Sequence, residues 1–103
     1  MAKKIVELAS KRKVELKEMS IDDIDFCTDL IRLVTDDDGN QIVTGMAKSR
    51  TAWLRRGIKG GDFKNFSVDK STGFVTDKVI KQLKENEKNE LIQEIQEFQT
   101  LGE

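Results

Sequence analysis

The chain has 103 residues, 37 % hydrophobic and 36 % charged, which fits one domain, residues 1–103, with a small core. Its net charge of −1 is not the strongly basic balance of a nucleic-acid-binding protein, and no apolar run approaches the roughly 18 residues of a membrane span. It has no histidine and one cysteine, which argues against zinc sites, internal disulfides and histidine-based catalysis, so we expect no enzyme, cofactor or metal centre.

Residues 1–19 predict a β-hairpin. Residues 5–9 and 14–19 both alternate apolar and polar side chains, as half-buried strands do. The apolar side chains of both strands share one face only if the loop has an odd number of residues, so a three-residue loop fits, although no glycine is available for a left-handed position. Because a lone hairpin is marginal in water, its apolar face must pack on the helices that follow.

Residues 20–34 predict an acidic helix. Ser20 can cap its first turn, in which two aspartates favour the positive end of the helix dipole. Cys27 lies on the apolar stripe, and we interpret it as a small buried side chain rather than a reactive thiol. Phe26 and Leu33 widen the stripe, which suggests a second contact surface. The stripe recurs at steps of three and four residues, at Ile21, Ile24, Cys27, Leu30, Ile31 and Val34.

The loop over residues 35–40 contains three consecutive aspartates, which invite a calcium interpretation. Counting from Asp36, the glycine falls at the fourth position and Ala47 at the twelfth, where an EF-hand needs glycine at the sixth and glutamate at the twelfth. We therefore expect a solvated acidic turn. Residues 41–44, which follow, are too short to place.

Residues 46–57 predict a basic helix, which ends at Gly57 because glycine is favoured just past a helix C-terminus. Its single tryptophan, Trp53, has two interpretations: a core side chain, or an anchor for a partner chain, since tryptophan and arginine are enriched at interface centres. Five cations in this region are candidate phosphate contacts: Lys48, Arg50, Arg55, Arg56 and Lys59.

Residues 76–101 predict a C-terminal helical pair, interrupted near Asn86 within a polar stretch. The second helix carries its own apolar stripe, at Leu91, Ile92, Ile95, Phe98 and Leu101. The elements together predict an α+β fold that is mainly α-helical, with an N-terminal β-hairpin followed by about four short helices. These helices offer more apolar surface than a short hairpin covers, so we expect five side chains to bind a partner: Trp53, Leu54, Leu91, Ile95 and Phe98.

Charge is segregated along the chain. Residues 20–38 hold seven aspartates against one arginine, and residues 46–70 hold seven basic residues against two aspartates. One explanation is internal, with the acidic helix lying beside the basic one. The other is external, with the basic segment meeting an acidic partner or a phosphate group.

The order of these motifs resembles the small tail assembly chaperones of tailed bacteriophages. The resemblance rests on the hairpin of residues 4–20 that leads into the acidic segment 21–25, and on the C-terminal segments 79–83 and 89–98. Residues 53–63 have no counterpart. The resemblance implies a non-enzymatic helper in the host cell cytoplasm that binds the tape measure protein, which is long, helical and apolar, before tail tube subunits polymerise around it. It implies no catalytic residues.

Two alternatives remain open. The chain could be a nucleic-acid-binding phage accessory protein that uses the basic segment 48–64, or a phage virion structural protein. Self-association, or another helical phage protein as partner, would also use the apolar helix edges.

Overall fold

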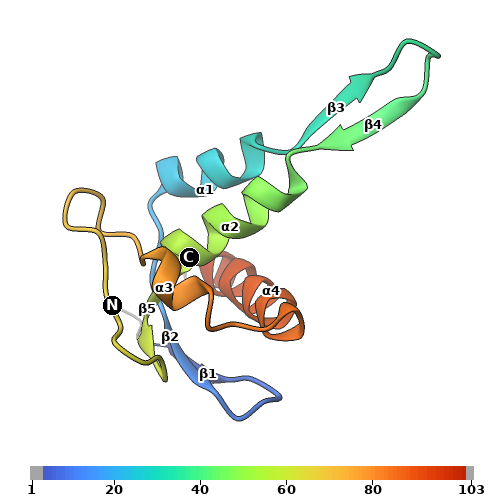
Figure 1. Ribbon diagram of the computed structural model, residues 1–103. Helices are drawn as coiled ribbons and strands as arrows, with labels where there is room; N and C mark the ends of the chain where they lie inside the picture. Colours follow the sequence, from blue (N-terminus) through green and yellow to red (C-terminus); the bar gives the residue numbers. More distant parts are fainter. Residues whose placement is uncertain (1–3, 102–103) are drawn as a thin grey trace.

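The computed structural model describes residues 4–101, over which the chain forms five strands and four helices (Figure 1). The first three residues of the predicted hairpin, and the side chain of Leu101, lie outside the described part. The prediction of a mainly helical fold with one hairpin is wrong, because two further strand segments pair into a second hairpin and another joins the first. None of the helices within residues 4–101 is long and apolar enough to cross a membrane.

The predicted N-terminal hairpin is present as β1 (Lys4–Glu7) and β2 (Lys13–Leu16), which pair antiparallel with Val6 opposite Val14. Its loop has the expected three residues. The backbone N–H of Leu8 donates to the carbonyl of Arg12, and that of Lys11 donates to the carbonyl of Leu8, both at 2.8 Å. Lys11 takes the left-handed position, at φ 77°, for which the sequence has no glycine. β5 (Ile58–Gly61) adds a third antiparallel strand beside β2.

The predicted acidic helix is shorter than residues 20–34. α1 spans Ile21–Asp29, and its cap is as expected, because the backbone N–H of Asp23 donates to Ser20 Oγ at 3.1 Å. The remainder forms β3 (Arg32–Thr35), which pairs antiparallel with β4 (Gln41–Thr44) across the acidic turn. Pairing with β4, which begins nine residues after β3 begins, therefore overrides the helical spacing of the apolar side chains.

The predicted basic helix is present as α2 (Met46–Gly57), and the C-terminal pair as α3 (Asp77–Ile80) and α4 (Glu85–Leu101). The interruption lies before Glu85 rather than near Asn86. The polar stretch thus begins α4, where its glutamates suit the positive end of the helix dipole.

One apolar core joins the three-stranded sheet to the helices. Leu8, Val14 and Leu16 of the N-terminal hairpin, which share the predicted face, are nearly or fully buried together with Leu54 of α2 and Leu91 of α4. Figure 1 shows α2 lying between α1 and α4 above the sheet. The β3–β4 hairpin contributes no residue to this core and projects away from it.

Candidate interaction surfaces

The five side chains expected to bind a partner lie in the core. Trp53 is 6 % exposed and Phe98 5 %, while Leu54, Leu91 and Ile95 are at most 1 % exposed. The apolar helix edges expected from the sequence are therefore closed, because α2 and α4 pack against each other and against the sheet. In this conformation none of the five offers a surface to another chain.

The exposed apolar side chains gather instead on the β3–β4 hairpin. We call residues 32–44, the two strands and their turn, the arm. All eight strand residues of the arm are exposed. Of the ten exposed large hydrophobic side chains within the described residues, six belong to the arm or flank it: Ile31, Leu33, Val34, Ile42, Val43 and Met46.

The arm is apolar on both of its faces. Leu33 lies opposite Val43, and the neighbouring pair, Val34 opposite Ile42, points to the other face because successive side chains of a strand alternate. These four side chains are 42 to 61 % exposed. Both strands are also sheet edges, with backbone groups that another strand could pair with. A two-stranded sheet of this kind is marginal alone, so contact with another polypeptide would stabilise it.

The turn of the arm is acidic and well ordered by its own hydrogen bonds. Asp36 Oδ1 accepts from the backbone N–H groups of Asp38 and Asn40, at 3.0 and 2.8 Å. Gly39 supplies the left-handed position, at φ 85°. The side chains of Asp37 and Asp38 are left exposed at the tip.

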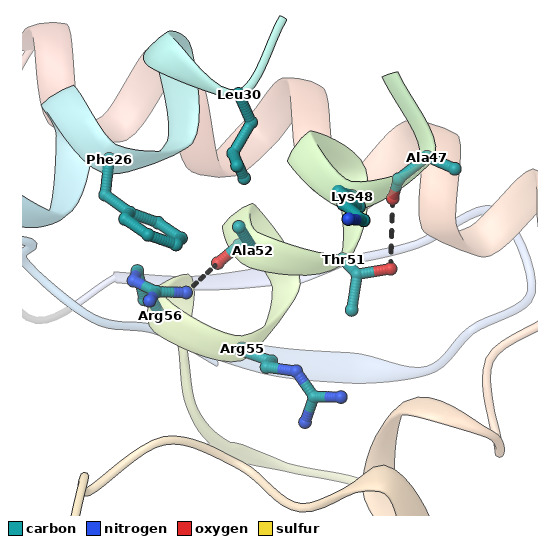
Figure 2. A pocket seen from close by; sticks show the side chains of 8 residues that line it. All are labelled: Phe26, Leu30, Ala47, Lys48, Thr51, Ala52, Arg55 and Arg56. Atoms are coloured by element: carbon teal, nitrogen blue, oxygen red, sulfur yellow. Dashed lines mark hydrogen bonds between the residues drawn. The ribbon is translucent and has the colours of Figure 1, made fainter. Parts of the chain in front are cut away.

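A groove runs between α1 and α2, close to the base of the arm (Figure 2). Its volume is about 440 Å³. Phe26 of α1 and Leu30, which directly follows that helix, form one wall, and residues of α2 form the other, with the cationic side chains of Lys48, Arg55 and Arg56 among them. The groove is thus an apolar channel with a cationic rim. Its lining residues are Phe26, Leu30, Ala47, Lys48, Thr51, Ala52, Arg55 and Arg56.

Arg56 closes one end of this groove. Its guanidinium carbon lies 4.2 Å from the centroid of the Phe26 ring and 4.3 Å from that of Phe74, and Arg56 Nε is 3.7 Å from Asp23 Oδ1. Its Nη1 also donates to the carbonyl of Ala52, at 3.4 Å. Stacking between two rings fixes the side chain, so Arg56 joins the long loop before α3 to α1.

Most of the predicted phosphate contacts have carboxylate neighbours. Arg50 lies 2.9 Å from Glu85, and Arg55 2.5 Å from Asp77. Hydrogen bonds from these arginines lower the pKa of both carboxyl groups. Lys59 is 4.0 Å from Glu15.

Together with the Arg56–Asp23 pair, these contacts leave Lys48 as the one predicted contact without a carboxylate within 4.0 Å in residues 4–101. As the internal explanation expects, α1 lies beside α2, but Asp23 is the one aspartate of residues 20–38 that pairs with a cation among the residues described. The partners of Arg50 and Arg55 come from α4 and α3 instead.

Three buried polar or titratable side chains serve the fold. Glu87, at 3 % exposure, accepts hydrogen bonds from Ser10 Oγ at 2.7 Å and Arg12 Nε at 2.8 Å, which tie the first hairpin loop to α4. Cys27 is fully buried, as expected, and burial raises the pKa of its thiol to about 11. Ser49 Oγ donates to the carbonyl of Cys27, at 2.8 Å, and so joins α2 to α1.

Sequence reasoning missed the arm as a surface, although one signal for it was present. β-branched and apolar residues flank an Asp-Asp-Asp-Gly-Asn turn, which is a hairpin pattern. Comparison with protein-family models, curated proteins and solved structures found no match to this chain. What it does is therefore inferred from its own residues and contacts.

Proposed function

We propose that this chain is a non-enzymatic assembly chaperone that uses its arm to hold an apolar segment of another protein. The observation that carries the proposal is the arm itself, a projecting hairpin with apolar side chains on both faces that the core does not use. Exposed apolar patches on small domains mark sites of protein association. The rest of the described chain, which we call the body, supports this role, because its core is closed without any residue of the arm.

The client we propose is the tape measure protein of a tailed bacteriophage, bound in the host cell cytoplasm before the tail tube assembles. This part of the proposal is supported by the resemblance of residues 4–25 and of the C-terminal segments to tail assembly chaperones. A highly charged carrier can keep an apolar client from aggregating by covering its apolar surface. If the carrier's own apolar surface is small, the client can still be released.

Co-expression with the tape measure protein tests the proposal. The wild-type chain should co-purify with the client and raise its soluble fraction. The variant Leu33→Asp with Val43→Asp, which places two charges on one face of the arm, should retain about tenfold less client, because it removes apolar contact and buries charge.

Ile21→Asp is the matched control, because Ile21 is an exposed apolar residue, 77 % exposed, outside the arm. It should bind the client as the wild type does. Failure of the wild-type chain to co-purify, or equal binding by the arm variant, would contradict the proposal. Presence of the protein in finished virions would favour the structural alternative, since a chaperone is displaced.

The nucleic-acid alternative gains no support as a second candidate. Four of the five cations on which it depended have carboxylate neighbours within 4.0 Å: Arg50, Arg55, Arg56 and Lys59. Phosphate groups would have to compete with these carboxylates for the same cations.

A further inference from the structure

The arm and the groove are complementary in both polarity and charge. The arm carries apolar side chains along its strands and exposed carboxylates of Asp37 and Asp38 at its tip. The groove has apolar walls and a cationic rim. From this complementarity we infer that the arm of one copy of the chain docks in the groove between α1 and α2 of a second copy.

The dimensions of the two elements agree. The α2 wall of the groove runs from Ala47 to Arg56, which is about 14 Å at the rise of an α-helix. A four-residue strand of the arm extends over about 13 Å. An arm laid along the groove can therefore place an apolar pair against Phe26 and Leu30 and bring its tip to Lys48, in the first turn of α2.

The charges support the same occupant. Lys48 is exposed and has no carboxylate within 4.0 Å among the residues that the structure describes, whereas Arg55 and Arg56 are already paired with Asp77 and Asp23. The acidic tip can therefore pair with Lys48 at the rim of the groove. A basic segment would instead bring like charges together at Lys48.

The arm cannot fill the groove of its own copy. It leaves the body at the end of α1 and α2 and points away from them (Figure 1). Its base is closely packed, because a Cβ atom built on Gly45 would lie 1.8 Å from the carbonyl oxygen of Leu30. Folding the arm back would break this contact, so the occupant has to be another molecule.

The contact joins the arm of one copy to the groove of another, and it gives a two-fold dimer if it is reciprocal or a chain of copies if it continues in one direction. A groove covers one face of a two-stranded hairpin, so the opposite apolar face stays open to a client. Self-association of this kind can be measured with the purified chain alone. It can be tested whether or not the proposed chaperone function holds.

Sedimentation velocity of the purified protein, over a wide range of concentration, tests the inference. The wild-type chain should associate beyond a monomer as concentration rises. The tip variant Asp37→Lys with Asp38→Lys, and the groove variant Lys48→Glu, should each weaken association about tenfold or more, because like charges then meet. Lys48 lies in the first turn of α2, where glutamate suits the helix dipole, so this variant should fold.

An equimolar mixture of the two variants provides the decisive measurement. The unchanged groove of the tip variant accepts the unchanged tip of the groove variant, so the mixture should associate more tightly than either variant does alone. Lys70→Glu, which makes the same charge change on an exposed loop, should associate as the wild type does. A wild-type monomer at every concentration, unaltered association of either variant, or a mixture that stays monomeric would overturn the inference.

Discussion

Glu87 shows how one side chain can join distant parts of the chain. It is buried, and burial is the largest single influence on its pKa, which it raises. Hydrogen bonds from the Lys84 backbone, Arg12 and Ser10, with the charge of Arg12, together outweigh burial and lower the pKa from 4.5 to about 2. The native state therefore stabilises the ionised form of the Glu87 carboxyl group.

The lowered pKa predicts how stability depends on pH. The stabilisation from Glu87 is complete above about pH 4.5 and is lost as the pH falls toward 2, because the unfolded state then binds a proton that the native state does not. Glu87→Gln should lower the free energy of unfolding at pH 7 by about 1–3 kcal/mol. Its deficit should shrink as the pH falls through this range.

Urea unfolding, followed by the fluorescence of the buried Trp53, measures both effects. Glu97→Gln, an exposed carboxylate on the same helix, is the control and should show neither. A Glu87→Gln deficit that stays constant with pH would contradict the assigned role of the ionised carboxylate.

At the scale of elements, the contact between α2 and α4 depends on the absence of a side chain at Gly57. A Cβ atom built there would lie 2.4 Å from Cγ2 of Ile95, which is fully buried and has no room to move away. The helices approach this closely because glycine leaves the space free.

Gly57→Ala should therefore lower the free energy of unfolding by about 1–3 kcal/mol, as overpacking of a core does. The sign is informative, because intrinsic helix propensity favours alanine. Gly60→Ala is the matched control: its nearest neighbour would be Glu15 Oε1 at 3.7 Å, an ordinary contact. Thermal or urea unfolding of both variants checks the prediction, and equal stability of the two would refute the packing argument.

The elements also show how far sequence patterns reach. Local signals worked where one segment decides its own structure: Ser20 caps α1, and the alternation of residues 5–19 fixed the register and loop length of the first hairpin. They failed at residues 30–34, because the same apolar spacing suits a helix and a strand. Residues 32–35 form a strand because they pair with residues 41–44. The sequence of one segment alone does not show which other segment it pairs with.

The candidate surfaces show the same limit. Trp53, Leu91 and Ile95 were identified correctly as apolar positions. They are buried together in one core, and this tertiary packing cannot be seen in the periodicity of the sequence. Phe26 and Leu33 were singled out for a second contact surface, and they lie in the groove and on the arm. Which apolar stripe becomes core depends on the packing of the whole chain.

At the scale of the whole molecule, the arm and the body are separable. No arm residue belongs to the core, and a Cβ atom on Gly45 would lie 3.5 Å from Cα of Ile31, so the two ends of the arm nearly touch. Replacing residues 32–44 with a short Gly-Ser turn should therefore change the free energy of unfolding by no more than about 1 kcal/mol.

The armless variant should keep cooperative urea unfolding and the native fluorescence of Trp53. It should lose client binding and self-association together, if both use the arm. Loss of cooperative unfolding would show instead that the arm is part of the folding unit, and the surfaces assigned to it would need revision.

The position of α4 in the chain has a consequence for biosynthesis. Leu91, Ile95 and Phe98 complete the interior that the first hairpin begins, and Glu87 holds the loop of that hairpin from 75 residues away. The first hairpin can therefore complete its packing only after residues 85–101 have been synthesised, so we expect it to stay incompletely folded on the ribosome until α4 emerges.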